Sequence, residues 1–228
     1  MNPGARLVVL GKQGAGKGTQ AVRLSRHYVV PHVSTGDTFR AAVRSGSEFG
    51  GKARQYLDAG ELVPDEIVIG MVRERLTRGD TTTRGFILDG FPRTVHQAEA
   101  LAEMLYPKQI DLVIDLEVHT EQVLTRLASR RVCSDCGANY SVVDNPPRVD
   151  VICDVCGGEV VQRDDDTEAA IRRRLELYER ETAPLVEWYK SRGLLIVVDG
   201  SGSPDAVTGR VVDEIDQRRE PAKVVDGG

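Results

Sequence analysis

Residues 7–17 read LVVLGKQGAGK, and this segment indicates how the chain begins to fold. The apolar run Leu7–Leu10 is short and continuous, as expected for a strand buried on both faces of a parallel sheet. The glycines after it let the backbone wrap inward, so that successive N–H groups face one anion. A helix opening at Lys17 adds the positive end of its dipole, and the lysine adds a full charge. The segment therefore predicts a phosphate-binding loop between a strand and a helix.

Outward from this loop, short apolar runs alternate with segments of helical pattern. The other runs lie at 29–33, 86–88, 112–114 and 194–198. The helical candidates lie near 17–27, 35–45, 50–58, 64–77, 94–105, 120–131, 166–181 and 204–217. Pro184 is expected to end or restart the helix that begins at Asp166. This alternation predicts an α/β fold in which a parallel five-stranded sheet is flanked by helices.

Two segments break the alternation and are expected to be insertions. Residues 34–63 carry helical patterns without a good strand, and residues 129–166 carry the cysteines with little helical period. The core is expected to comprise residues 1–33, 64–128 and 167–217. The end of the chain, 218–228, is expected to be a polar tail.

Composition excludes several classes of function. The 228 residues carry a net charge of −5, which disfavours a general nucleic-acid binder. No apolar stretch approaches the roughly 18 residues of a membrane span, and the start lacks a secretory signal. We therefore expect a cytoplasmic protein without a membrane partner. We also expect a monomer, because no exposed apolar helix stands out.

The four cysteines form two pairs, Cys133-x-x-Cys136 and Cys153-x-x-Cys156, with sixteen residues between the pairs. This spacing predicts a structural Zn²⁺ site, since four thiolates fill a tetrahedron and leave no position for substrate. The segment is too short to build an adequate core alone, and metal binding can supply the folding energy. The alternatives are two disulfides or four incidental thiols. A zinc ribbon on nucleic acid is disfavoured, because only Arg148 is basic between the pairs.

Three motifs together carry a family resemblance. They are GKGTQ at 16–20, STGD at 34–37 followed by Arg40, and LDGFPR at 88–93. With Gln97, they resemble adenylate kinases among the nucleoside monophosphate kinases, over about residues 6–215. The resemblance implies an AMP-binding insertion at 34–63 and a zinc-binding lid at 129–166, as in adenylate kinases of Gram-positive and related bacteria. Two loop positions depart from the family's usual pattern: Lys12 adds a charge, and Gln13 replaces a frequent proline. Gly18 departs only from the general phosphate-loop pattern, in which Ser or Thr at that position holds Mg²⁺.

The resemblance also implies site residues. For ATP it implies Gly14, Ala15, Gly16, Lys17, Gly18, Thr19, Arg126, Arg130 and Gly202. For AMP it implies Thr35, Arg40, Glu61, Leu62, Val63, Gly90, Arg93, Gln97, Arg163 and Arg174. For catalysis it implies Lys17, Asp89, Arg93, Arg130, Arg163 and Arg174. Guanidinium groups suit this task because they grip phosphate oxygens bidentately and stay charged.

Some roles also follow from the residues themselves. Arg126 and Arg130 lie four apart on a predicted helix, hence on one face. Asp89 ends a buried strand at the sheet edge where ligands bind, and its carboxylate could hold a water on Mg²⁺. Asp166 either orients the arginines that close over the site or caps the next helix. Arg172 and Arg173 are expected to be surface charges.

The predicted function is reversible phosphoryl transfer from Mg-ATP to AMP, giving two ADP, by in-line transfer with charge stabilisation and lid closure. One alternative is a kinase for another nucleoside monophosphate, or an AMP kinase that uses GTP. A third hypothesis is a phosphate-loop switch or a nucleic-acid-binding zinc protein without transferase activity. It gives the motifs at 34–37 and 88–93 no role.

Overall fold

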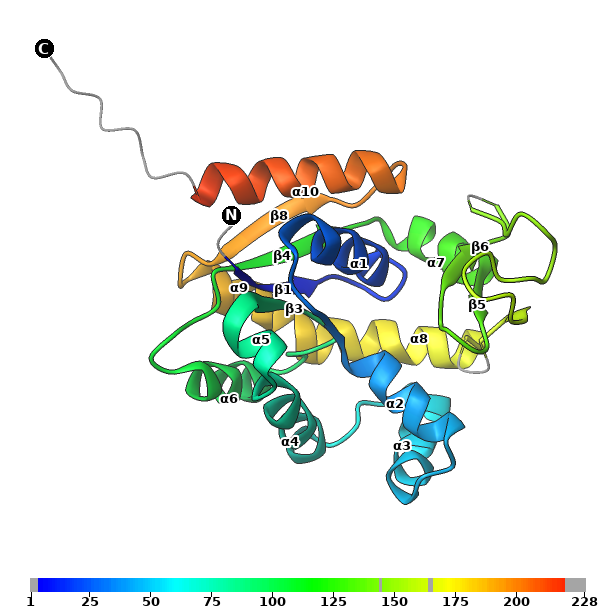
Figure 1. Ribbon diagram of the computed structural model, residues 1–228, viewed down its shortest axis with the longest axis horizontal. Helices are drawn as coiled ribbons and strands as arrows, with labels where there is room; N and C mark the ends of the chain where they lie inside the picture. Colours follow the sequence, from blue (N-terminus) through cyan, green and yellow to red (C-terminus); the bar gives the residue numbers. More distant parts are fainter. Residues whose placement is uncertain (1–3, 144, 164–165, 220–228) are drawn as a thin grey trace, which may run out of the picture.

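The computed structural model describes residues 4–143, 145–163 and 166–219. At its centre is a five-stranded sheet in the order β2-β3-β1-β4-β8, in which every neighbouring pair is parallel (Figure 1). In sheet order the strands are β2 (His32–Ser34), β3 (Gly85–Asp89), β1 (Ala5–Leu10), β4 (Leu112–Glu117) and β8 (Leu195–Asp199). The predicted α/β fold with a parallel five-stranded sheet is confirmed.

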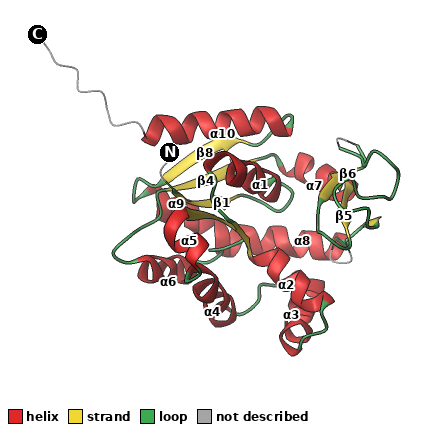
Figure 2. Ribbon diagram, viewed as in Figure 1, coloured by secondary structure: helices red, strands yellow, loops and turns green. Residues whose placement is uncertain are grey.

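Both faces of the sheet are buried, as the continuous apolar runs predicted. Successive residues of β1 alternate between two hydrophobic clusters: Val8 and Leu10 belong to one, and Leu7 and Val9 to the other. The first cluster includes residues of α4, α6 and α9, and the second includes residues of α1 and α10. The sheet is therefore a layer between two sets of helices (Figure 2).

The helices match the predicted pattern with two additions. They are α1 (Lys17–Tyr28), α2 (Thr35–Arg44), α3 (Glu48–Ala59), α4 (Asp65–Leu76), α5 (Gly79–Arg84), α6 (Val95–Leu105), α7 (Thr120–Ser129), α8 (Glu168–Leu177), α9 (Ala183–Lys190) and α10 (Pro204–Arg219). The sequence pattern missed α5, and it gave α9 only as one of two outcomes at Pro184, the end or the restart of the preceding helix. Between α8 and α9 lies a π-helical turn, η1 (Tyr178–Thr182). The restart expected near Pro184 is found here, since proline has no N–H to donate and α9 begins at Ala183.

Two predicted elements have different bounds in the structure. The strand expected at 29–33 is β2, which begins only at His32, because Val29 ends α1 in a left-handed conformation with φ 55°. The helix expected at 120–131 ends at Ser129, and Arg130 begins a strand with φ −66° and ψ 137°. The prediction that Arg126 and Arg130 share one helix face was therefore wrong.

The cysteines lie in a small lobe of their own, at the right of Figure 1, which we call the cysteine segment (residues 130–161). Its three-stranded sheet has the order β6-β5-β7 and is antiparallel. The strands are β5 (Arg130–Cys133), β6 (Asn139–Ser141) and β7 (Val160–Val161). Ser129, at the end of α7, therefore leads directly from the core into this lobe.

The last helix, α10, continues to Arg219, and residues 220–228 of the predicted tail lie outside the described residues. Among the described residues, none of the helices has the length and apolar character needed to span a membrane.

Candidate nucleotide site

The loop between β1 and α1 has the conformation that its glycines allow. Gly11, Gly14 and Gly16 have φ values of 132°, 84° and 100°, in the region that disfavours side chains. A Cβ on Gly14 would lie 3.0 Å from Cγ of Leu127, so a larger residue would also be crowded. Gly16 offers no side chain to cap α1, so the first N–H groups of this helix are available to an anion.

Lys17 is held by the loop that precedes it. Its Nζ donates to the carbonyl oxygens of Gly11 at 2.7 Å and Lys12 at 2.9 Å. Burial lowers the pKa of Lys17 to about 8, opposed by the charge of Asp89 and assisted by that of Arg93. The loop therefore holds a desolvated cation where phosphate oxygens would lie.

A cleft of about 970 Å³ runs between the core, the helices α2 and α3, and the cysteine segment. Every residue that the sequence assigned to ATP, AMP or catalysis lines this cleft. They come from elements far apart in the chain, from the phosphate loop at one end to Gly202 before α10. A cleft of this volume accommodates ligands larger than a single nucleotide.

At the sheet edge, one group of residues surrounds Gly90. Arg93 Nε donates to the Gly90 carbonyl at 2.9 Å, and Thr35 Oγ1 donates to the same oxygen at 2.8 Å. Gln97, only 1% exposed, accepts from the Arg93 N–H at 2.8 Å and donates to Asp65 at 2.6 Å. Burial, followed by the charge of Arg174, lowers the pKa of Arg93 to about 10. The Arg93 guanidinium is thus oriented by its own loop, and it lines the cleft.

The far wall is formed by α2 and by the segment after α3. Arg40 pairs with Asp37 one turn earlier on α2. Glu61 pairs with Arg173 of α8 at 2.7 Å, while Leu62 and Val63 line the cleft beside it. Arg173, expected to be a surface charge, is partly exposed, and its pair with Glu61 joins α8 to this wall.

On the opposite side, arginines converge from three elements. Arg126 of α7 donates to the carbonyls of Ala15 at 3.3 Å and Gly200 at 3.0 Å. Arg130 of β5 donates through Nε to Asp166 at 2.8 Å, and Arg174 Nη1 lies 3.9 Å from the same carboxylate. Thr167, not Asp166, caps α8, so of the two roles left open for Asp166 the structure shows the arginine contact. Arg163 also lines the cleft and is half-buried.

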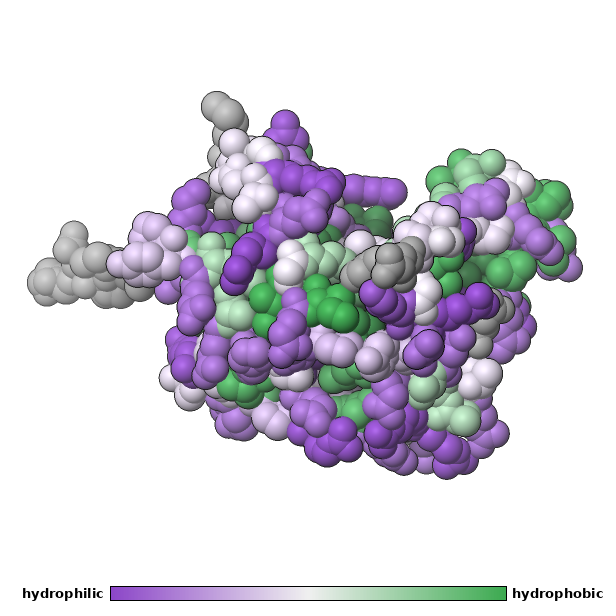
Figure 3. Space-filling view, turned by 90° about the horizontal axis from the view of Figure 1, so that it is seen from below, coloured by the Kyte–Doolittle hydropathy of each residue, from purple (hydrophilic) through white to green (hydrophobic). Residues whose placement is uncertain are grey.

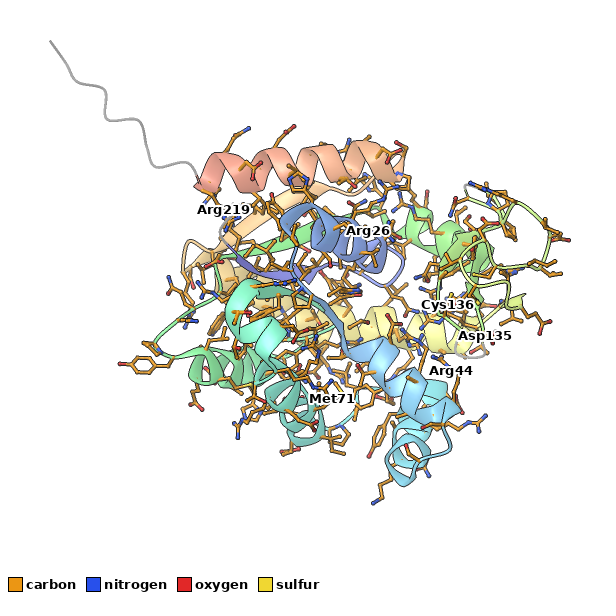
Figure 4. The ribbon with its side chains drawn as sticks, viewed as in Figure 1. Arg26, Arg44, Met71, Asp135, Cys136 and Arg219 are labelled. Carbon is orange, nitrogen blue, oxygen red and sulfur yellow. The ribbon has the colours of Figure 1, made fainter. Side chains whose placement is uncertain are left out.

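The four cysteine sulfurs lie together, within 4.8 Å of one another. The Cys133–Cys156 and Cys136–Cys153 sulfurs are 3.5 and 3.6 Å apart, far longer than a disulfide of about 2.05 Å. A tetrahedral zinc with Zn–S bonds of about 2.3 Å places its ligand sulfurs about 3.8 Å apart. The donor set therefore fits a structural Zn²⁺, and Figure 4 shows Cys136 and Asp135 in this lobe.

Comparison with known proteins identifies the family. A family model described as adenylate kinase matches residues 9–194. The chain belongs to the adenylate kinase family. A protein named adenylate kinase from Archaeoglobus fulgidus is 52% identical over 203 residues, which cover 88% of this chain and 93% of its own. Proteins of the same name from Moorella thermoacetica and Caldicellulosiruptor bescii are 52% and 50% identical, over 89% and 86% of this chain and 94% and 91% of their own.

Adenylate kinases are nucleotide phosphotransferases, and Asp89 of this member lines the cleft at the C-terminal end of β3. Its Oδ2 lies 3.6 Å from His32 Nε2. Burial would raise the pKa of Asp89, but the nearby His32 imidazole and the charge of Lys17 outweigh burial and lower it. The carboxylate is therefore ionised at neutral pH, and it is a hard oxygen ligand of the kind Mg²⁺ prefers.

Sequence reasoning missed two residues around this adenylate kinase site. Gln13, treated as a minor departure in the loop, lies against Asp166 and the arginines. Asp115, within the apolar run of β4, is buried beside the loop. An acidic residue inside an apolar strand was the available signal for Asp115.

Proposed function

We propose that this protein transfers the γ-phosphoryl group of Mg-ATP to AMP, giving two ADP, and that the reaction is reversible. The observation that carries the proposal is one cleft that holds both a phosphate loop with Lys17 and an acceptor group built around Arg93. Two polyanions can meet in line only if their repulsion is neutralised, and the cleft supplies cations on both sides.

The phosphate loop would bind ATP. Its N–H groups and Lys17 would hold the β- and γ-phosphates, and Arg126 would lie beside the adenosine, next to Gly200 and Gly202. Asp89, through water, would hold Mg²⁺, with Thr19 nearby in the loop. When bound, the metal would neutralise charge on the phosphates.

The acceptor residues would bind AMP. Arg40 and Arg93 would grip its phosphate, because both guanidinium groups line the cleft. Thr35, Gln97 and the stretch from Glu61 to Val63 would form the base pocket. Gln97 supports an adenine base because its amide, which bonds the Arg93 N–H and Asp65, has a second N–H and a second oxygen lone pair.

The remaining arginines would act on the phosphoryl group in transit. Arg130, Arg163 and Arg174 lie along one side of the cleft, and bidentate guanidinium groups stabilise charge that develops on phosphoryl oxygens. Residues 34–63 would be the AMP-binding insertion and 129–166 the lid, both moving on a core of residues 1–33, 64–128 and 167–217. Closure would exclude water, which would otherwise accept the phosphoryl group.

The zinc site would keep the lid rigid. A lobe this small buries little apolar surface, and its described cluster consists of Cys133, Tyr140, Cys153 and Val160 with Ala138 against it. Exposed apolar side chains gather on the lobe at the right of Figure 3, namely Val142, Val143, Val149, Val151, Ile152 and Val155. With so small a core, Zn²⁺ would supply folding energy there.

The test is a coupled assay of ADP formation with Mg-ATP and AMP, UMP, CMP or GMP offered separately. We expect fast turnover with AMP alone. Preference for another monophosphate would overturn the roles of Gln97 and Thr35 but keep those of the arginines. Replacing ATP by GTP in the same assay identifies the donor. Absence of turnover with every acceptor, in folded zinc-loaded protein, would reject the proposal.

A further inference from the structure

The side chain of Gln13 reaches from the phosphate loop to the arginines on the other side of the cleft. With the amide in one orientation, Nε2 donates to Asp166 Oδ1 over 3.4 Å. With the amide turned over, Oε1 accepts from Arg174 Nη1 at 2.9 Å and from Arg130 Nη2 at 3.1 Å. The second orientation is favoured, because it replaces one long hydrogen bond with two short ones from charged donors.

This contact joins three parts of the chain that are far apart in the sequence. Gln13 lies between β1 and α1, Arg130 begins the cysteine segment, and Arg174 lies on α8 after that segment. Asp166, whose side chain is fully buried, bonds Arg130 and lies 3.9 Å from Arg174. Gln13 therefore connects the phosphate loop to the first residue of the cysteine segment and to the helix that follows this segment.

The chemistry of an amide suits this position. Its oxygen accepts from both guanidinium groups without cancelling their charge. Asp166 already supplies one negative charge to the pair, so a second carboxylate would leave the arginines with no net charge for a phosphoryl group. Alanine at position 13, by contrast, would not change the charge of the two arginines but would no longer fix the orientation of their guanidinium groups.

We infer that Gln13 is a positioning residue for phosphoryl transfer: its amide oxygen holds Arg174 and Arg130 against the phosphate loop, in the orientation from which they contact the transferring group. The inference rests on the proposed function, which gives these arginines their role. Because it concerns arginine orientation at the moment of transfer, it affects kcat more than the binding of either nucleotide.

The first experiment compares Gln13→Ala, Gln13→Met and Gln13→Glu with the wild type in steady-state kinetics with Mg-ATP and AMP. Methionine matches the length of glutamine without its acceptor, so it separates the hydrogen bonds from the space filled. We expect kcat to fall about tenfold in the Ala and Met variants, as for the loss of a hydrogen bond to a charged group. Both KM values should change less than about twofold, and melting temperatures should not change. Gln13→Glu should lose more kcat than either.

The second experiment introduces Gln13→Ala into an Arg174→Met background. If Gln13 acts through Arg174, its removal costs a smaller factor in kcat there than in the wild type. Equal factors in both backgrounds would overturn the inference, as would a wild-type kcat in Gln13→Met. A wild-type protein without AMP-dependent turnover would instead reject the proposed function, so the two failures are distinguishable.

Discussion

The carboxylate of Asp166, whose side chain is fully buried, accepts a hydrogen bond of 2.8 Å from Nε of Arg130, a residue 36 positions earlier in the chain. This pair joins the first residue of the cysteine segment to the residue before the α8 cap. The start of the cysteine segment and the residue two places before α8 therefore meet at this ion pair beside the cleft.

Removing this carboxylate should destabilise the protein. Asp166→Ala removes the carboxylate that pairs with the largely buried Arg130, and breaking a buried pair costs about 3–5 kcal/mol. Denaturant unfolding monitored by circular dichroism measures the change. Glu168→Gln is the control, because its pair with Arg172 is 81% and 72% exposed and should contribute little. A similar, small loss in both variants would contradict the prediction.

Replacing Lys17 should abolish activity but keep the fold. Lys17→Met removes the cation in the loop, and we expect kcat to fall by about 100- to 1000-fold, as for loss of a donor to developing charge. Its folded pKa, about 8, lies below the ordinary value, so the buried ammonium lowers stability at neutral pH. The free energy of unfolding at pH 7 should stay unchanged or rise. If Lys17→Met has a kcat near the wild-type value, Lys17 has no role in phosphoryl transfer.

Asp115 should make stability depend on pH. Burial, assisted by the charge of Glu117, raises the pKa of Asp115 to about 6. Between pH 4 and 6 the folded protein holds a proton that the unfolded chain has lost, so the stability present below pH 4 is lost as pH rises through 6. The loss is at most about 3 kcal/mol, because each tenfold change in proton affinity corresponds to about 1.4 kcal/mol.

Asp115→Asn tests this directly. The variant should have a higher free energy of unfolding than the wild type at pH 8, by about 1–3 kcal/mol, and the difference should shrink toward pH 5. Asp58→Asn, at a carboxylate 58% exposed, should change the pH profile little. Parallel wild-type and Asp115→Asn profiles would show that Asp115 does not titrate in this range.

Loss of the metal should destabilise the cysteine segment. Zinc analysis of purified protein should find one Zn²⁺ per chain, and chelation or Cys153→Ser should lower the melting temperature by about 5–10 °C. Ser134→Ala, beside a ligand but without a sulfur, is the matched control. The affinity for AMP, measured at low temperature, should change little. If the purified protein contains no zinc and chelators leave its melting temperature unchanged, the prediction of a zinc site is wrong.

A glycine at position 29, at the end of α1, should stabilise the protein. Val29 is 64% exposed and has φ 55° and ψ 44°, a conformation that costs a β-branched residue about 1–2 kcal/mol. Val29→Gly should therefore raise the free energy of unfolding by about 1 kcal/mol. Val22→Gly, within the same helix, should lower it by a few tenths. If both glycines destabilise the protein, the conformation at residue 29 is not strained.

Much of this protein follows from local pattern. Short apolar runs such as Leu7–Leu10 are typical of strands buried on both faces of a parallel sheet, and their alternation with helical patterns predicted the α/β fold. The loop glycines and the Cys-x-x-Cys pairs combine residue type with short spacing, so their chemistry can be predicted without knowledge of tertiary contacts. Those features, with the family motifs, were determined by the sequence alone.

Tertiary structure decided which side chains meet. Arg130 carries a helical pattern, yet it begins β5 because pairing with Ser141 across the small sheet replaces the helix bonds. Asp166 could have capped α8, but Thr167 does so, and the carboxylate turns to an arginine 36 residues away. Gln13 contacts Arg130 and Arg174 only because the folded chain brings β5 and α8 beside the phosphate loop. The local sequence specifies hydrogen bonds between residues a few positions apart. Contacts between distant residues, such as Arg130 and Asp166, depend on how the helices and strands pack around the cleft.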